Sequence, residues 1–207
     1  NQPEKVYLDI ETWKTLPERQ LSSGLAETIK HACLADGEMF DYLEKNIEKI
    51  LVNDKDACEY IAEHNCAVKY KVVMKDERES GLREVLNLGH TVGRAIETVS
   101  DYKLLHGEAV SIGLIAQAKL GEKYGYISPE NVSRVIKLCE RAKLPVAIPD
   151  YIDKAALVRK LYTDKKVRDG KLRMVFQKEI GDVMCFGDND YAKQITEPEI
   201  AEVINEM

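Results

Sequence analysis

The sequence lacks the features that would indicate a membrane protein or a nucleic-acid-binding protein. No apolar run approaches the roughly 18 to 20 residues that a membrane-spanning helix needs. The first residues have neither the basic start nor the apolar middle of a signal peptide. A net charge of −6 provides no basic surface for nucleic acid. We therefore expect a cytoplasmic protein that has neither a membrane nor nucleic acid as a partner.

The sequence also lacks paired cysteines and a dinucleotide-binding motif. The five cysteines form no C-x-x-C pair and are scattered through apolar or helical runs: Cys33, Cys58, Cys66, Cys139 and Cys185. We expect them to be reduced and mostly buried, as is usual for an intracellular protein. No strand followed by a glycine-rich turn opens a βαβ unit, so the sequence indicates no dinucleotide-binding fold within this chain.

The hydrophobic pattern indicates a mainly α-helical protein. The chain has 207 residues, of which 44% are hydrophobic, and can bury a sizeable core. Apolar residues recur at helical spacing in most of the chain, which predicts helices over 17–36, 36–54, 54–76, 79–100, 104–125, 128–142, 154–162 and 196–207. Asp54, Ser128 and Thr196 are suited to cap three of them. A short strand and turn should open the chain, and one β-hairpin should lie around Gly170 and Gly181. The expected fold is a helical bundle-like domain with a small hairpin.

One stretch, "REVLNLGHTVGRAIE" at 83–97, carries polar residues at helical spacing. On a continuous helix these side chains share one face about 80° wide: Glu79, Arg83, Asn87, His90 and Arg94. Gly89 and Gly93 flank this face and would let another backbone or a ligand approach closely. A polar face on a largely apolar helix should meet water, a ligand or a metal. The residues alone leave open a solvated face with ordinary i,i+4 pairs.

A second histidine favours a metal. His106 lies 16 residues after His90, at the start of the next apolar helix, and two adjacent helices can present both imidazoles to one divalent ion. His31 and His64 are expected to be ordinary hydrogen-bonded residues. A catalytic zinc site needs a third protein ligand, and "GLAETIK" offers Glu27. Spacing alone does not choose this glutamate from the 36 acidic residues.

Three motifs in this order, "GLAETIKHA", "ESGLREVLNLGHTVGRAIE" and "LLHGEAVSIGL", resemble the metal-binding domain of 3-dehydroquinate synthase. The resemblance extends to "TLPERQ" before them and "DKKVRDGKLRMVF" after them, and thus covers nearly the whole chain. It implies a lyase of the shikimate pathway, in aromatic amino-acid biosynthesis. Such an enzyme converts the sugar phosphate DAHP to 3-dehydroquinate and phosphate, with catalytic NAD and a divalent metal, usually Zn²⁺, with Co²⁺ or another ion as alternatives.

The resemblance also assigns roles to individual residues. It implies a metal held by Glu27, His90 and His106. It implies that the following residues act on or bind the substrate: Lys30, Glu79, Arg83, Asn87 and the pair Lys165 and Lys166, of which Lys166 is preferred. The stretch expected to touch NAD is Thr12, Trp13, Lys14 and Thr15. Residues 1–16 would form a junction with an NAD-binding domain, 17–207 the helical metal and substrate domain, and a homodimer is compatible with the family.

Two departures from the family pattern matter. Where the family usually has a second histidine, in G-H-T-x-G-H-A-x-E, this sequence has Arg94. An arginine does not shuttle a proton near neutral pH, and we hypothesise that Arg94 contacts an anionic substrate. The family's NAD-binding domain should precede the first residue, so we expect this chain to bind metal without turning over substrate alone.

Two alternatives remain open from the sequence, and a third is disfavoured by it. Other sugar-phosphate cyclases, such as those that make deoxy-inosose or valiolone precursors, share the three metal ligands. Iron-type polyol dehydrogenases place an aspartate and additional histidines at the metal, which "GLAETIKHA" does not supply. A non-catalytic metal-binding remnant would bind zinc stoichiometrically and have no activity.

Overall fold

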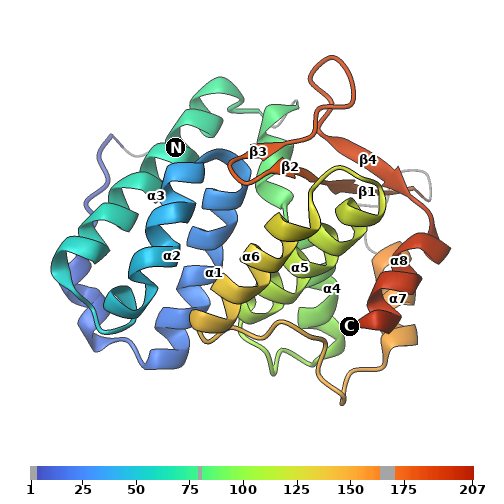
Figure 1. Ribbon diagram of the computed structural model, residues 1–207, viewed down its shortest axis with the longest axis horizontal. Helices are drawn as coiled ribbons and strands as arrows, with labels where there is room; N and C mark the ends of the chain where they lie inside the picture. The colour runs from blue at the N-terminus through green and yellow to red at the C-terminus, as the bar shows by residue number, and fades with distance from the viewer. Residues whose placement is uncertain (1–3, 79–80, 164–170) are drawn as a thin grey trace.

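Helices form most of the protein in a computed structural model that describes residues 4–78, 81–163 and 171–207. The α-helices are α1 (Glu18–Ala35), α2 (Gly37–Leu51), α3 (Lys55–Lys75), α4 (His90–Val99), α5 (His106–Lys123), α6 (Pro129–Arg141), α7 (Lys154–Thr163) and α8 (Glu197–Glu206). Two 3₁₀ helices, η1 (Ile10–Thr15) and η2 (Leu82–Asn87), precede α1 and α4. The mainly α fold predicted from periodicity is confirmed (Figure 1). Within the described residues, no helix is both long and apolar enough to cross a membrane.

Side-chain caps explain where several helices begin. The carboxylate of Asp54 accepts a hydrogen bond from Ala57 N at 3.0 Å at the start of α3. The hydroxyl of Ser128 accepts one from Asn131 N at 3.2 Å at the start of α6. At α8, Thr196 is the N-cap, and its own N–H donates to Glu199 at 2.8 Å. These contacts satisfy backbone donors that have no partner inside the helix, and the three predicted caps are confirmed.

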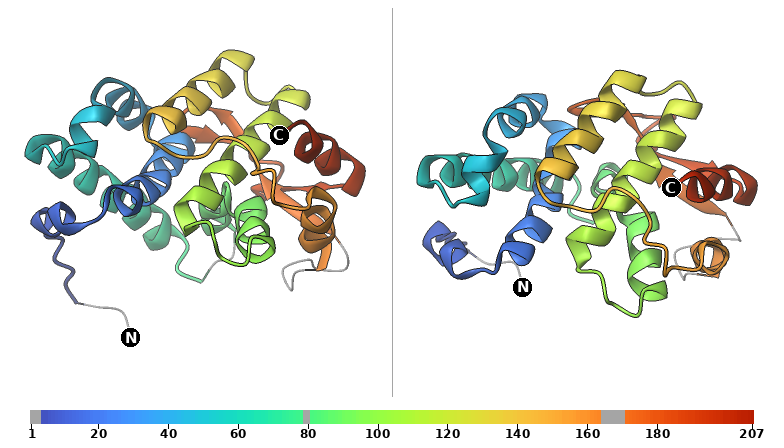
Figure 2. Two further views of the ribbon diagram at one scale, coloured as in Figure 1. Left: turned by 90° about the horizontal axis from the view of Figure 1, so that it is seen from below. Right: turned by 60° about the horizontal axis from the view of Figure 1, so that its bottom comes forward.

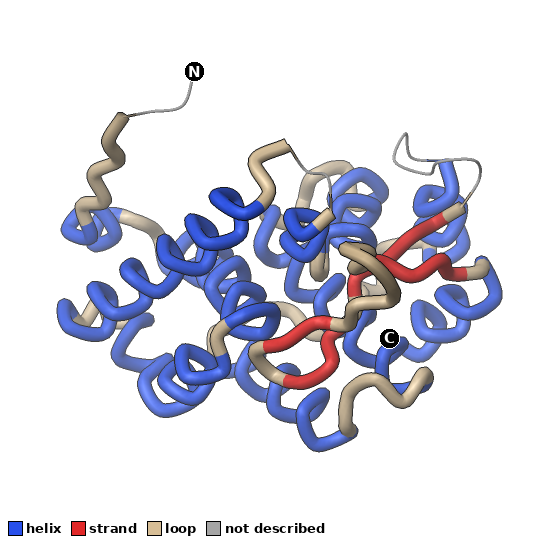
Figure 3. Tube along the Cα trace, turned by 90° about the horizontal axis from the view of Figure 1, so that it is seen from above, coloured by secondary structure: helices blue, strands red, loops and turns tan. Residues whose placement is uncertain are grey.

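The β structure is larger than the single hairpin predicted around Gly170 and Gly181, of which Gly170 lies outside the described residues. Strands β2 (Gln177–Glu179) and β3 (Asp182–Val183) pair antiparallel across a turn at Gly181, whose φ of 90° favours glycine. A second antiparallel pair joins β1 (Leu172–Val175) to β4 (Ala192–Ile195), with Leu172 opposite Ile195. The sequence prediction missed this pair because its strands are separated by a long connection. Figure 3 shows both pairs on one side of the helices.

Helix α5 lies at the centre of the protein. It packs against α4, α1, α6 and α8, and most of its side chains are buried. One group of core residues gathers around α1, α2 and α3, and another gathers around α4, α5, α7, α8 and β1. In Figures 1 and 2, α1, α2 and α3 lie on one side of α5, and α7 and α8 lie on the other. The central helix therefore fixes the other helices relative to one another.

The sequence predictions for the N-terminal segment and for the cysteines have different outcomes. The expected strand near the N-terminus is wrong, because residues 4–9 form no strand and the chain then enters η1; this segment extends away from the helices (Figure 2). All five cysteines are free, and three of them are buried: Cys33, Cys58 and Cys139. The division into residues 1–16 and 17–207 stays a prediction.

Candidate metal centre

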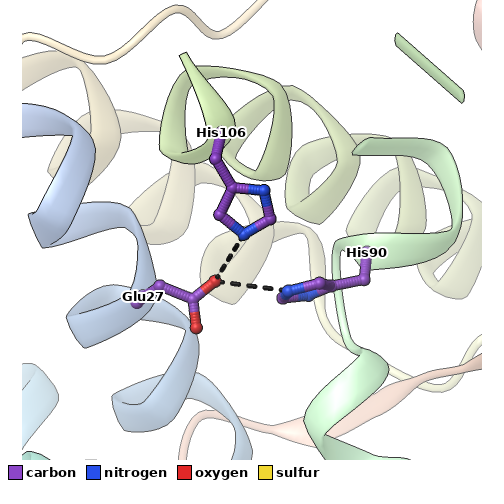
Figure 4. A group of neighbouring side chains, drawn as sticks. All are labelled: Glu27, His90 and His106. Atoms are coloured by element: carbon purple, nitrogen blue, oxygen red, sulfur yellow. Dashed lines mark ion pairs between the residues drawn. The ribbon is translucent and has the colours of Figure 1, made fainter. Parts of the chain in front are cut away.

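Three side chains from three helices meet at one point (Figure 4). Glu27 lies in the middle of α1, His90 is the first residue of α4 and His106 is the first residue of α5. Glu27 Oε1 lies 3.4 Å from His90 Nε2 and 3.4 Å from His106 Nε2. One ligand atom from each residue lies within 4.8 Å of the other two. The fold thus brings together residues that are up to 79 positions apart in the sequence.

The three residues fit a divalent metal such as zinc. Two imidazole nitrogens and one carboxylate oxygen are common zinc donors, and catalytic zinc sites commonly have three protein ligands. Ligand atoms about 2.1 Å from a tetrahedral zinc lie roughly 3.4 Å from each other, which agrees with the Glu27–histidine distances. Glu27 Oε1 is shielded from solvent but has no hydrogen-bond partner. A bound cation would satisfy this oxygen, which is otherwise costly to bury.

The second nitrogen of each imidazole faces an acceptor. His90 Nδ1 lies 3.2 Å from the carbonyl oxygen of Leu88, and His106 Nδ1 lies 3.1 Å from Glu97 Oε1. A proton on each Nδ1 can be donated to these oxygens, which leaves the lone pair of each Nε2 directed toward Glu27. Metal-binding histidines are commonly oriented in this way. The resemblance had not assigned a role to Glu97, although its motif contains this residue.

The polypeptide breaks its helix just before His90, so the predicted continuous helix over 79–100 is wrong. The 3₁₀ helix η2 ends at Asn87, Gly89 adopts a left-handed conformation with φ of 77°, and α4 begins at His90. A residue other than glycine would be strained at Gly89. The shared polar face calculated for Glu79, Arg83, Asn87, His90 and Arg94 therefore does not exist as one helix face. The prediction of close approach is confirmed, because Gly89 and Gly93 lie against the backbone of α5.

The start of α5, which carries His106, is tied to α1, which carries Glu27. Arg19 on α1 donates two hydrogen bonds of 2.7 Å to the carboxylate of Glu108. Glu108 in turn accepts one of 2.8 Å from Leu105 N, and Ser23 Oγ accepts one of 3.0 Å from Gly107 N. Bidentate arginine–carboxylate pairs are geometrically specific. These contacts fix the distance between Glu27 and His106.

Lys30 determines the charge at the site. It is only 2% exposed, and its Nζ lies 2.8 Å from Glu27 Oε2 and donates to Leu86 O at 3.1 Å. Burial lowers the pKa of Lys30, and the charge of Glu27 opposes this effect. Burial, the largest single effect, acts to raise the pKa of Glu27, but the charge and hydrogen bond of Lys30, with smaller contributions from His90 and His31, together lower it. At neutral pH Glu27 is therefore an anion, as a metal ligand must be.

The pKa of His90 predicts how the metal-free protein responds to acid. Burial, and then the charge of Lys30, lowers the pKa of His90 to about 4. The unfolded chain takes up this proton near pH 6.5, so the free energy of unfolding should fall as the pH falls from 6.5 toward 4, by roughly 3 kcal/mol for this residue. The lowered pKa of Glu27 acts in the same direction. Urea unfolding with EDTA at pH 7.5 and pH 4.5 measures the loss.

His90→Gln is the matched variant for that measurement. It should lose less stability between the two pH values than the unsubstituted protein does, because it has no imidazole to protonate at this position. Equal losses in the two proteins would show that His90 is not held neutral by its burial.

The other predicted site residues that the structure describes lie on η2, α4 and η1. Arg83 and Asn87 lie on η2, where the guanidinium of Arg83 donates to Glu77 O at 2.9 Å. Arg94 is exposed on α4, one turn after His90, and its charge contributes to the lowered pKa of Lys30. The four residues predicted to touch NAD form most of η1, which packs against α3. Glu79, Lys165 and Lys166 lie outside the described residues.

Comparison with known proteins identifies the family. Residues 24–167 match the family described as 3-dehydroquinate synthase C-terminal. The chain belongs to this family. The 3-dehydroquinate synthase of Ruminiclostridium cellulolyticum is 41% identical over 196 residues, which are 94% of this chain and 54% of that protein. The 3-dehydroquinate synthase of Methylococcus capsulatus is 46% identical over 182 residues, 87% of this chain and 51% of that protein. The chain thus spans about half the length of these curated relatives, and the resemblance seen in the sequence is confirmed.

Solved structures of sugar-phosphate cyclases share the fold. A 2-epi-5-epi-valiolone synthase from Streptomyces hygroscopicus, with NAD⁺ and Zn²⁺ bound, superposes with a TM-score of 0.83. It is 26% identical, and the match covers 96% of this chain and 54% of that one. A 2-deoxy-scyllo-inosose synthase in complex with carbaglucose-6-phosphate, NAD⁺ and Co²⁺ has a TM-score of 0.85 at 23% identity, over 96% of this chain and 55% of that one. The second comparison supports the fold alone.

Proposed function

We propose that this chain forms the metal-binding part of a 3-dehydroquinate synthase, which converts DAHP to 3-dehydroquinate and phosphate. The observation that carries the proposal is the position of Glu27 Oε1, which lies 3.4 Å from the Nε2 atoms of both His90 and His106. Family membership and 41% to 46% identity to named 3-dehydroquinate synthases support the choice of reaction. A divalent ion bound to these residues supplies a Lewis acid for the oxygens of the substrate.

The residues around this point have separable tasks in the proposed reaction. Glu27 and the neutral imidazoles bind the cation, while Lys30 holds the second oxygen of Glu27 and so orients the carboxylate. Lys30 also brings positive charge to a site that must accept a phosphate and a carboxylate. Arg94 on α4 adds an exposed guanidinium one turn from His90. We propose that these two cations favour the doubly charged phosphate of the substrate.

The proposal includes NAD as a cofactor of the complete enzyme. The valiolone synthase that shares this fold was solved with NAD⁺ bound, and the resemblance assigns NAD contacts to residues 12–15. Three of these side chains engage in local contacts within η1: Thr12 with Asp9, Lys14 with Glu11, and Thr15 with Thr12. Their contact with NAD remains part of the proposal.

Substrate choice separates this reaction from that of other cyclases. The natural full-length polypeptide, supplied with NAD and Zn²⁺, should release phosphate from DAHP and not from glucose 6-phosphate. Phosphate release is measured with each sugar phosphate at the same concentration. If phosphate were released from glucose 6-phosphate and not from DAHP, the proposed reaction would be wrong. The result would then favour the reaction of another sugar-phosphate cyclase, whose fold this chain shares.

Zinc should stabilise the folded chain. A ligand that binds only the folded state stabilises it by mass action, by about 2.7 kcal/mol at a hundredfold excess over Kd. For a chain of this length that is a rise in Tm of roughly 5 to 10 °C, which EDTA should reverse. NAD should change the Tm by less than zinc does, because the sequence shows no glycine-rich dinucleotide motif. An unchanged Tm in saturating zinc would contradict the proposed metal site, and zinc binding without activity in the full-length polypeptide would support a non-catalytic remnant.

Arg94→His tests the proposed anion contact and also restores the usual family residue. A hydrogen bond to a charged group contributes about 1.5 kcal/mol, so its loss should raise the KM for DAHP roughly tenfold. The fold should be unaffected, because Arg94 is exposed. Steady-state kinetics of the full-length enzyme measure the change, and an unchanged KM and kcat would refute the assigned contact.

A further inference from the structure

We propose that Gln117 is a positioning residue of the metal centre, which holds the turn that presents His90. This inference rests on the metal site proposed above and adds a residue to it. Gln117 lies on α5, eleven positions after His106, and is only 1% exposed. A buried amide must find partners for both its oxygen and its nitrogen.

The two ends of this amide bind two different parts of the fold. Its Oε1 accepts a hydrogen bond from Gly89 N, and its Nε2 donates one of 2.8 Å to Val175 O at the end of β1. Gly89 is the left-handed residue immediately before α4. The N–H of a residue at this position has no partner within its own helix. The side chain of Gln117 therefore joins the start of α4 to the small sheet.

The turn held by Gln117 determines where His90 lies. Gly89 O accepts the hydrogen bond of 3.0 Å from Gly93 N, near the start of α4. Leu88 O lies 3.2 Å from His90 Nδ1 and so orients the imidazole. A shift of the peptide between Leu88 and Gly89 would move both the helix start and this acceptor. Gln117 thus acts on the metal through His90 and does not contact it.

Helix α5 has little freedom to compensate for a lost amide. Gly113, one turn before Gln117, packs so closely on the turn that a Cβ there would lie 2.0 Å from Gly89 O. A side chain without polar atoms at position 117 would leave Gly89 N and Val175 O buried without these partners. The turn would then relax away from α5 and carry His90 with it.

Gln117→Met tests the inference, because methionine has a similar volume and no hydrogen-bonding amide. We expect the zinc Kd to rise about 10-fold, the lower end of the loss caused by removing a direct partner of a metal ligand, because Gln117 acts through the turn before His90, and we expect the visible absorption bands of the Co²⁺-loaded protein to shift. Gln117→Asn keeps the amide but is one methylene too short to reach both partners. It should show the same changes and serves if the methionine variant does not fold.

Ser111→Ala is the matched control on the same helix. Ser111 is also 1% exposed and donates a partly buried hydrogen bond of 2.9 Å to Pro145 O, outside the metal centre. Its loss should lower the Tm and leave the zinc Kd and the Co²⁺ spectrum unchanged. Wild-type zinc affinity and an unshifted spectrum in the Gln117 variants would overturn this inference alone. A wild-type protein that bound no zinc would overturn the metal centre, and this inference with it.

Discussion

Replacing His106 with alanine is expected to weaken zinc binding by at least roughly 100-fold and to reduce turnover of the full-length enzyme by a similar factor. Loss of a residue that only supports a ligand costs 10- to 100-fold in metal affinity, and loss of a direct ligand should cost no less. The His106 side chain is 49% exposed, and it lies against Glu27 and Glu97. The metal-free variant should therefore fold normally, with a free energy of unfolding within about 0.5 kcal/mol of the original.

His64→Ala is the matched control for this experiment. His64 is also partly exposed and also faces a carboxylate, since its Nδ1 lies 2.7 Å from Asp36 Oδ2. It stacks on Tyr60 and is not part of the metal centre. A competition titration with a zinc-binding dye should show normal affinity in His64→Ala and weak binding in His106→Ala. Equal affinities in the two variants would contradict the role of His106.

Replacing Gly107 with alanine is expected to lower the free energy of unfolding by about 3 kcal/mol or more. A Cβ at Gly107 would lie 1.8 Å from Ser23 O and 2.7 Å from Ser23 Oγ, much closer than atoms can approach. Helices α1 and α5 would have to separate, and the hydrogen bond from Gly107 N to Ser23 Oγ would be lost. Because Glu27 lies on α1 and His106 starts α5, zinc affinity should fall as well. For a chain of this length the Tm should drop by roughly 6 to 12 °C.

Gly24→Ala is the control that separates steric overlap from helix propensity. Gly24 lies in α1, one residue from Ser23, and a Cβ there would meet no atom within 4 Å. Alanine favours a helix over glycine by about 1 kcal/mol, so this variant should be more stable and bind zinc normally. Thermal unfolding measures the Tm of Gly107→Ala and of Gly24→Ala. Similar Tm values in the two variants would show that α1 and α5 are not in tight contact.

Much of the fold was predictable from local sequence. Helical spacing of apolar residues and the caps at Asp54, Ser128 and Thr196 depend on neighbours in the chain, and each is confirmed. The satisfied histidines were also expected: His31 faces Asn65 at 2.9 Å and His64 faces Asp36 at 2.7 Å. The break before His90 was not predicted, because a regular polar spacing extended across it. The periodicity of the polar residues predicted a helix through position 89, but Gly89 packs on α5 in a left-handed conformation and ends it.

The candidate site depends on contacts that the sequence pattern does not show. The two histidines were close enough in sequence to suggest a pair, but Glu27 could be selected only through the resemblance. Glu97, Glu108 and Gln117 were missed because each acts through a partner on another segment: His106, Arg19 and Gly89, respectively. Glu108 does have a local signature, since it is the third residue after the N-cap Leu105 and binds its N–H.

A crystal of the zinc-soaked protein, measured on both sides of the zinc absorption edge, tests most directly whether Glu27, His90 and His106 share one metal ion. One strong anomalous peak is expected, about 2.0 to 2.2 Å from Glu27 Oε1 and from both histidine Nε2 atoms. No peak at this position in saturating zinc, or a peak bound by other residues of the chain, would contradict the shared metal ion.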